Sequence, residues 1–332
     1  MIHPIDITRN LIDLYRRTNR SLACSKPYHT KLYNWPAHIY DQDLWLSRFI
    51  ELSEVLKKKP KAKIGLYSVF GPRWIIDYTK ADIKLFLSRE NLHRINWRHY
   101  ADQCIGYPGI DLTIGFDYPE NQSGTVHPNY IRVPLWIMWV FSPDDNFRTV
   151  RQKIAAIEAP ENKSFDDRKF CSFLSSHFDI GRDKIVEQIS SIERIDCDGK
   201  LFHNNDDLKT LYNDDKLEYL RHYRFNLCPE NSNYAGYCTE KIFEAISSGC
   251  IPIYNGSDNR PEPDVLNPEA ICFFDFENAN ERTLSLVADL NSNRNQYLEF
   301  ANQPRFVPGA EEIIWGYFEL LRARTDELLK NI

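Results

Sequence analysis

One short segment carries charged and polar side chains at the spacing of an anion-binding site. The apolar run Phe225–Cys228 predicts a buried strand, which opens into the polar loop 230–237. The next helix is expected to start at Thr239, whose side chain would cap it, with Glu240 and Lys241 in its first turn. Main-chain N–H groups at a helix start favour an anion, and Lys241 adds a positive charge. The segment therefore predicts a diphosphate site that needs no metal, with Glu240 turned toward sugar hydroxyls.

The same segment leaves a plainer interpretation open, namely an ordinary helix start with a surface lysine. Tyr234 and Tyr237 in the loop could pack on a nucleobase. Gly249 is expected to close the helix in the left-handed conformation. Pro252 favours an edge strand, or the first position of a strand. The chain has no Gly-x-Gly-x-x-Gly and no Walker lysine motif, which argues against a standard dinucleotide or ATP site.

Two further carboxylates follow predicted strands in the N-terminal half. Glu90 comes just after the run Ile83–Leu87, and Asp117 ends the run Leu112–Phe116. Open α/β sheets bind ligands beyond the carboxyl ends of their strands, so both side chains are expected at the edge of a cleft. On position alone, an ordinary surface glutamate is the more frequent interpretation of Glu90.

Metal-ligand patterns are weak. The triplets 41–43 and 196–198 have the Asp-x-Asp pattern of metal-dependent transferases, but chance pairs are expected among 47 acidic residues. The nine histidines show no HxH or HExxH pairing, and the eight cysteines form no CxxC pair. We therefore expect structural histidines and buried, reduced thiols.

Apolar runs bounded by turn residues place these side chains on two successive strand–helix patterns. In the first, the predicted helices cover 7–17, 43–56 and 97–104, and the predicted strands cover 64–70, 83–87, 112–116 and 131–133. The polar stretch 142–168 is expected to be a linker. In the second, the predicted strands cover 170–174, 224–228, 251–254 and 271–274, and the helices cover 182–193, 240–248 and 311–331. This alternation predicts an α/β fold with two Rossmann-like domains that face each other across a cleft.

Composition limits the class of partner. The 332 residues, 42% of them hydrophobic and 27% charged, suffice for two domains, and the net charge of −6 argues against nucleic acid as a partner. No signal-peptide pattern follows Met1, and the longest apolar run is 135–141. We expect a soluble, cytoplasmic protein in at most peripheral contact with the inner face of a membrane. The lysine-rich run 57–63 is expected to be a solvated helix end, with an anionic-surface patch as the alternative.

The segment from Phe225 to Gly256 resembles the signature of glycosyltransferase family 10, the α-1,3/α-1,4-fucosyltransferases that use GDP-fucose. The resemblance is carried by Phe225-Asn226-Leu227-Cys228, Glu230-Asn231, Tyr237, Thr239-Glu240-Lys241, Pro252 and Gly256. Weaker similarity follows the family's order at 64–71, 88–91, 114–117, 130–134 and 169–175. The sequence departs from the family at Arg89, Pro229 and Asn255, where members commonly carry a small residue, phenylalanine and tryptophan.

The resemblance implies a GT-B fold. It implies an acceptor-binding domain over 1–155, a GDP-fucose-binding domain over 156–310, and a helix over 311–332 that packs back on the first domain. The donor is then GDP-fucose, with no cofactor or metal required. The acceptor is an oligosaccharide or glycolipid of the N-acetyllactosamine type.

The resemblance also implies roles for individual residues. Lys241 and Arg182 would hold the diphosphate, and the donor pocket would be lined by Asn231, Tyr237 and Glu240. Glu90 matches the family's general base. An inverting transfer needs a base that takes the proton of the acceptor hydroxyl, and partial burial tunes a carboxyl pKa for that task. Asp117 is the reserve candidate for this base.

Two other functions stay open. One is a metal-dependent glycosyltransferase that uses another nucleotide sugar, and the other is a binding module that has kept the fold and lost catalysis. Activity that survives strong chelation would argue against the first. Turnover of GDP-fucose with a β-galactosyl acceptor would argue against the second.

Overall fold

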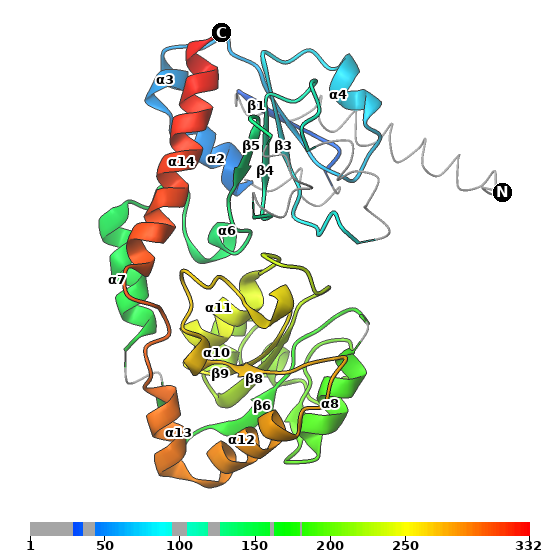
Figure 1. Cartoon of the computed structure of the whole chain (residues 1–332), viewed down its shortest axis with the longest axis vertical. Coiled ribbons are helices and arrows are strands. Elements are labelled where there is room, and N and C mark those ends of the chain that lie inside the picture. Colours follow the sequence, from blue (N-terminus) through cyan, green and yellow to red (C-terminus); the bar gives the residue numbers. More distant parts are fainter. Residues whose placement is uncertain (1–28, 36–43, 95–104, 119–126, 160–162, 180) are drawn as a thin grey trace, which may run out of the picture. The chain divides into compact units, whose positions relative to one another are not determined.

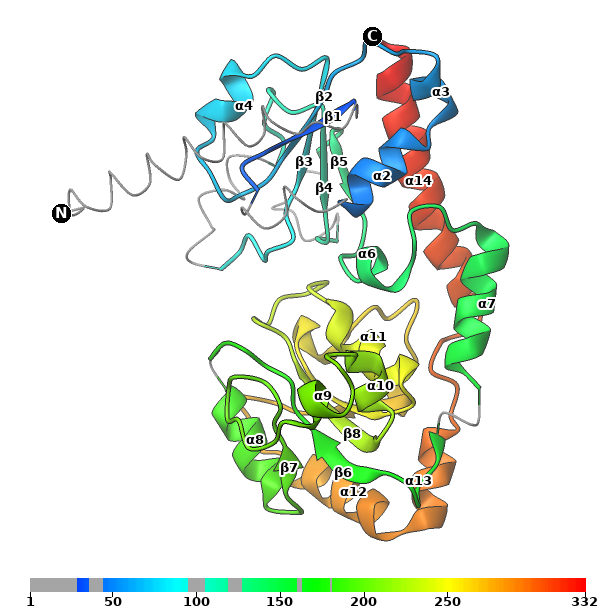
Figure 2. The ribbon, with the colours of Figure 1, turned by 180° about the vertical axis from the view of Figure 1, so that it is seen from behind.

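The computed structural model describes residues 29–35, 44–94, 105–118, 127–159, 163–179 and 181–332. Contacts divide the chain into two compact units. Unit 1 comprises the described residues up to Val133, with 142–144 and 316–332; unit 2 comprises the described residues of 134–141 and 145–315. Each unit contains a parallel sheet with helices around it (Figures 1 and 2), so the α/β class is confirmed. The placement of the two units across a cleft stays a prediction.

Unit 1 is built on five parallel strands that follow one another across the sheet in chain order. They are β1 (Thr30–Tyr33), β2 (Ile64–Tyr67), β3 (Ile83–Leu87), β4 (Leu112–Gly115) and β5 (Tyr130–Arg132). Every residue of β2, β4 and β5 is buried, as is typical of a parallel sheet covered on both faces. The register pairs Leu87 with Ile114, so β3 and β4 end side by side. β1 was not predicted from the sequence, because its four residues TKLY form no apolar run.

Unit 2 also has five parallel strands, but their order reverses once. The strands β6 (Lys169–Ser172), β7 (Ile195–Asp196), β8 (Tyr223–Pro229), β9 (Ile251–Asn255) and β10 (Cys272–Phe273) lie in the order β10-β9-β8-β6-β7. The chain places β7 on one side of β6 and then β8 on the other. Such a reversal is where open α/β sheets bind ligands, beyond the carboxyl ends of the strands. The described strands of unit 1 have no reversal.

The helices surround these sheets. Unit 1 has α2 (Trp45–Glu51), α3 (Glu54–Lys57) and α4 (Trp74–Tyr78). Unit 2 has α6 (Ile137–Val140), α7 (Phe147–Ile157), α8 (Arg182–Ser190), α9 (Asp207–Thr210), α10 (Lys216–Leu220), α11 (Glu240–Ser247), α12 (Glu281–Ser292) and α13 (Arg294–Ala301), with short 3-10 turns at Ser257–Asn259 and Pro268–Ala270. Among the described residues, no helix combines the length and apolar character needed to cross a membrane.

The last helix, α14 (Ala310–Lys330), is shared between the units and confirms the helix predicted over 311–331. From Gly316 onward it belongs to unit 1 and packs on α2. The ring of Phe318 lies 5.7 Å from Trp45 and 6.2 Å from Phe49. Arg322 donates to the Phe49 carbonyl at 2.7 Å. Apolar and polar contacts together therefore hold this helix on unit 1.

The prediction that 142–168 is a linker is wrong, because this stretch contains α7. The Asn146 side chain accepts from the Thr149 N–H at 3.1 Å, and the Thr149 hydroxyl accepts from the Asn146 N–H at 2.9 Å. This capping box starts a helix that buries Val150, Ile154 and Ile157. The apolar spacing was hidden among charged residues. The domain boundary expected after residue 155 falls inside this helix, which groups with unit 2.

Three further predictions need correction. The helix expected over 43–56 breaks at Ser53, which caps α3 by accepting from two N–H groups at 3.2 Å. Pro252 lies inside the sheet rather than at its edge, which is tolerated because β10 begins to pair only at Ile253. The helix expected over 182–193 ends at Ser190. Gly249, with φ of 76°, confirms the left-handed end of α11. The helices expected over 7–17 and 97–104 lie outside the described residues.

Six cysteines belong to the described part of the chain, and all are buried without a disulfide partner. They lie in unit 2, at Cys171, Cys197, Cys228, Cys238, Cys250 and Cys272. The expectation of buried thiols is confirmed for these six. Cys24 and Cys104 lie outside the described residues.

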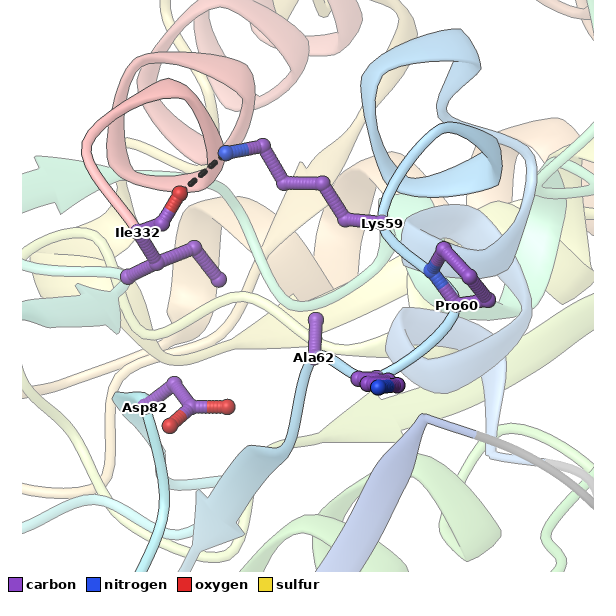
Figure 3. A pocket seen from close by; sticks show the side chains of 6 residues that line it. Lys59, Pro60, Ala62, Asp82 and Ile332 are labelled. Atoms are coloured by element: carbon purple, nitrogen blue, oxygen red, sulfur yellow. Dashed lines mark hydrogen bonds between the residues drawn. The ribbon is translucent and has the colours of Figure 1, made fainter.

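Unit 1 has an open cavity of about 680 Å³ at the amino ends of β2 and β3. It is lined by Lys59, Pro60, Lys61, Ala62, Asp82 and Ile332 (Figure 3). Lys59 donates to the main-chain oxygen of Ile332. Because all its lining residues except Ile332 directly precede β2 or β3, the cavity lies at the opposite strand ends from Glu90 and Asp117.

Candidate active site

A buried glutamate organises the start of α11. Glu230 directly follows β8 and is 3% exposed. Its carboxylate accepts from the Thr239 N–H at 2.8 Å, from the Thr239 hydroxyl at 2.7 Å and from the Lys241 ammonium at 2.9 Å. Three donors compensate the carboxylate for the water it has lost. The protein thus places an anion of its own at this helix start.

Thr239 is the N-cap residue of α11, but its side chain caps no first-turn N–H, so this prediction is wrong. The hydroxyl donates to Glu230 and accepts from Lys241 Nζ at 2.8 Å. Hydrogen bonds to charged groups are stronger than those to neutral main-chain groups. Glu230 and Lys241 therefore draw the hydroxyl away from its capping role.

Lys241 is not a surface lysine. Its side chain is 19% exposed and lies between two carboxylates, 2.9 Å from Glu230 and 3.8 Å from Glu240. Burial works to lower the pKa of Lys241, but the two carboxylates outweigh burial and raise it, while Arg182 acts in the lowering direction. Burial likewise works to raise the pKa of Glu240, but Lys241 outweighs it and the pKa is lowered. Both groups are therefore charged at neutral pH.

Arg182 ties together the two loops at the strand reversal. It opens α8, is 3% exposed, and donates to the Ser175 hydroxyl at 2.7 Å and to the His177 carbonyl at 2.6 Å. Its other terminal nitrogen donates to the Asn231 side-chain oxygen at 2.8 Å. Ser175 and His177 follow β6, whereas Asn231 follows β8. The structure thus brings Arg182 and Asn231, two of the predicted donor residues, into direct contact.

Glycine is required where the first of these loops enters α8. Gly181 has φ of 88°, a conformation that side chains rarely adopt. A Cβ there would lie 2.1 Å from the ring of Phe276. The close approach sets where α8 begins, and with it the position of Arg182.

The other predicted pocket residues divide into accessible and buried groups. Asn231 and Tyr234 are partly exposed, and the Glu240 side chain is 24% exposed. Tyr237 is 2% exposed, so it does not present its ring to solvent as a surface for a nucleobase. The donor-binding roles of Asn231, Tyr237, Glu240, Lys241 and Arg182 stay predictions.

This edge of unit 2 brings two cationic side chains to the starts of two helices. We define the cation site as Lys241 and Arg182. Arg182 belongs to α8, which follows β6, and Lys241 belongs to α11, which follows β8. Glu230 and Glu240 face Lys241, and Asp179 lies 3.6 Å from Arg182. Three carboxylates therefore face two cations, so the site holds no excess positive charge, and a diphosphate would be held by the N–H donors of the two side chains and of the helix starts rather than by net charge. The partly exposed Glu240 can accept hydrogen bonds from hydroxyl groups.

Glu90 and Asp117 both lie at the carboxyl edge of the unit 1 sheet. Each lies three positions after a member of the paired residues Leu87 and Ile114. Glu90 is partly exposed, and its N–H donates to the Ser88 hydroxyl at 3.1 Å. Asp117 is 3% exposed and accepts from His93 Nε2 at 2.7 Å. The edge therefore offers one carboxylate to solvent and encloses the other beside a histidine.

The Asp-x-Asp triplet at 196–198 is engaged in contacts within unit 2. Asp196 accepts from Lys169 at 3.2 Å and from the Tyr223 hydroxyl at 2.9 Å. Asp198 accepts from the Leu208 N–H at 2.7 Å and from the Tyr219 hydroxyl at 2.6 Å. These bonds attach α9 and α10 to the end of β7. The triplet at 41–43 lies outside the described residues, among which no group of three or more His, Cys, Asp or Glu could hold a metal.

Two residues of these edges were not predicted from the sequence. Glu230 was expected only as part of a polar loop, although its position directly after a buried strand indicates the carboxyl edge of the sheet. His93 was expected to be a structural histidine, because its partner Asp117 lies 24 positions away, beyond any local pattern. Only the pairing of β3 with β4 brings the two together.

Unit 2 matches a known family, and most of the chain shares the fold of a solved structure. Residues 166–306 match the family model described as glycosyltransferase family 10 (fucosyltransferase), C-terminal part. This range contains the whole unit 2 sheet and the cation site, and it confirms the resemblance seen in the sequence. A crystal structure of an alpha1,3-fucosyltransferase shares the fold, with a TM-score of 0.51 at 20% identity over 88% of this chain and 89% of that one.

Two curated relatives are similar over part of their length. An alpha-(1,3)-fucosyltransferase of Helicobacter pylori is 31% identical over 241 residues, which cover 64% of this chain and 47% of the relative. Alpha-(1,3)-fucosyltransferase B of Drosophila melanogaster is 28% identical over 180 residues, which cover 51% of this chain and 40% of the relative. The match thus spans about half, or less, of each relative.

Proposed function

Since residues 166–306 carry the C-terminal domain of glycosyltransferase family 10, we propose that this protein is an inverting α-1,3-fucosyltransferase. Its donor is GDP-β-L-fucose. Its acceptor is a GlcNAc or glucose hydroxyl of a β-galactosyl glycan, free or on a lipid. The observation that carries the proposal is the cation site at the strand reversal of unit 2, where Arg182 and Lys241 lie at the starts of α8 and α11.

In the proposed reaction, the acceptor oxygen attacks C1 of fucose as the bond from C1 to the diphosphate oxygen breaks. The electron pair of that bond leaves with GDP, and Lys241 and Arg182 stabilise the negative charge that develops there. The proton of the acceptor hydroxyl passes to the Glu90 carboxylate. A single displacement inverts C1, so the β-linked donor yields an α-linked product.

The remaining donor contacts follow from the chemistry of the same edge. Glu240 accepts hydrogen bonds from sugar hydroxyls, while the partly exposed Asn231 lines the pocket around the nucleotide. Two cationic side chains supply the positive charge that a divalent ion supplies in metal-dependent transferases. The proposed reaction therefore has no step that requires a metal.

The test is a transfer assay on the purified chain with GDP-fucose and N-acetyllactosamine or lactose, in the presence of EDTA. We expect release of GDP together with an α-1,3-fucosylated product, identified by mass spectrometry and linkage analysis. Binding of GDP-fucose without turnover on a glycan panel would instead indicate a binding module. Activity that EDTA abolishes and Mn²⁺ restores would indicate a metal-dependent transferase.

A further inference from the structure

A histidine and a buried aspartate bridge the two strand ends beside Glu90. His93 Nε2 lies 2.7 Å from Asp117 Oδ1, and the side chains are 29% and 4% exposed respectively. A carboxylate oxygen accepts hydrogen bonds, so this contact is a hydrogen bond when the ring carries hydrogen on Nε2. Removing that donor would take away this hydrogen bond from a buried carboxylate, and an unsatisfied buried polar group lowers the free energy of unfolding. The contact is therefore a strong tether between the segment after β3 and the end of β4.

The aspartate end of this tether is fixed. The Tyr130 hydroxyl donates to the Asp117 carbonyl at 3.1 Å. Arg132 Nε donates to the neighbouring Phe116 carbonyl at 3.0 Å. Both donors come from β5, the next strand of the sheet. Asp117 therefore has little freedom to follow His93 if the histidine moves.

The histidine end belongs to the short segment that carries Glu90. At its start, the Ser88 hydroxyl accepts from the Glu90 N–H at 3.1 Å and donates to the Glu90 carbonyl at 3.0 Å. At its end, the His93 N–H donates to the Asn91 side chain at 2.9 Å, and Asn91 is 2% exposed. Glu90 thus lies between a turn at Ser88 and the bridge to Asp117, with its side chain partly exposed.

We propose that His93, held by Asp117, is a positioning residue for Glu90. This inference rests on the proposed function, in which Glu90 is the general base. The tether fixes the position of the Glu90 backbone relative to the ends of β3 and β4. The Glu90 carboxylate therefore approaches the acceptor hydroxyl in one geometry. His93 acts through Glu90 and contacts neither sugar. Its loss misplaces the base without changing donor binding, because the donor residues belong to unit 2.

The first experiment measures kcat, both KM values and GDP affinity for His93→Ala, His93→Gln and Asp117→Asn. A small misplacement of a reacting group can lower a rate about 10²-fold, and we expect a kcat loss of that order for His93→Ala. GDP affinity and the KM for GDP-fucose should stay within about twofold of the wild-type values. A general loss of structure would change these binding constants together with kcat. His93→Gln, whose amide can donate to Asp117, should recover most of the rate. The exposed pair His222–Glu218, 3.7 Å apart, supplies the matched control His222→Ala.

The second experiment needs no turnover. The ¹⁵N chemical shifts of the neutral His93 imidazole can be assigned by comparison with His93→Gln. In the wild type they should show hydrogen on Nε2, and in Asp117→Asn these shifts should change. Hydrogen on Nδ1 alone, or a His93→Ala variant with wild-type kcat, would overturn the proposal. If the wild type does not transfer fucose but shows the Nε2–H form, the transferase assignment fails while the tether stands.

Discussion

The partners of Lys241 determine its charge and its burial. A lysine in the first turn of a helix usually faces water, yet this one is mostly buried and bonds to Glu230 and Thr239. The pKa of Lys241 is raised although burial opposes the charge, because two carboxylates face the ammonium. A cation held in this way costs little rearrangement when a diphosphate arrives, which is the condition for strong stabilisation of a leaving group.

The variant Lys241→Ala is expected to weaken GDP-fucose binding and to lower the rate of transfer by on the order of 10²-fold or more, because charge on departing GDP is no longer stabilised. Steady-state kinetics and calorimetric titration with GDP would measure both effects. Lys209→Ala, an exposed lysine on α9, is the matched control. A loss of only a few-fold in Lys241→Ala would count against the cation site.

Glu90 is expected to matter for the acceptor and not for the donor. Glu90→Gln keeps the shape of the side chain but cannot take a proton, so we expect transfer to be abolished with GDP-fucose affinity nearly unchanged. Single-turnover assays and equilibrium binding separate the two quantities. Normal turnover in this variant would reject Glu90 as the base and direct attention to Asp117.

Loops and helix starts decide where these side chains stand. The loop after β6 reaches Arg182 through Ser175, and the segment after β7 packs against the same serine, since the Leu201 N–H donates to the Ser175 carbonyl at 2.9 Å. A Cβ at Gly199 would lie 2.2 Å from that carbonyl oxygen. The donor edge therefore depends on a glycine that touches no predicted donor residue.

Gly199→Ala should displace Ser175, loosen its bond to Arg182 and weaken GDP binding by about tenfold, a loss typical of one charge-assisted hydrogen bond. Titration with GDP would measure the change. Gly316→Ala is the matched control, because a Cβ there meets nothing within 4 Å. That control should leave binding unchanged and stabilise α14 by about 0.5–1 kcal/mol. Unchanged GDP affinity in Gly199→Ala would show that the loop tolerates the shift.

In the described part of the chain, all six cysteines are buried and lie in unit 2. Burial raises the pKa of Cys197 to about 11 and the pKa values of Cys250 and Cys272 to about 12. An unfolded thiol has a pKa of about 8.5. Between these values the native protein holds protons that the unfolded chain has released, so folding is favoured less as pH rises.

The free energy of unfolding should therefore be steady near neutral pH and fall as pH rises from about 9 toward 11–12. Urea titrations under reducing conditions at pH 7, 9 and 10.5 would measure this fall. Cys250→Ala removes one such proton and should make the dependence on pH less steep, although the cavity it leaves lowers stability at every pH. A free energy that does not change between pH 8 and 10.5 would contradict the assignment of these thiols as buried.

Local patterns were sufficient for the elements whose residues carry their own signal. The buried strands at Ile83–Leu87 and Ile251–Asn255, the helix at Glu240–Ser247 and the last helix were predicted to within a residue or two. Their apolar runs and helix ends act over a few neighbouring positions, and so can be read from the sequence. The same reasoning brought Glu90, Asp117 and Lys241 to strand ends and a helix start.

Contacts between distant segments were decided only when the chain folded. The hydroxyl of Thr239 bonds to Glu230 instead of its own helix, and His93 reaches Asp117 across two paired strands. The helix Phe147–Ile157 gains its stability from burying three apolar residues that charged neighbours obscure in the sequence. A hydrogen bond or a buried helix face depends on which groups come into contact in the folded chain. The local spacing of residues in the sequence does not specify contacts between distant segments.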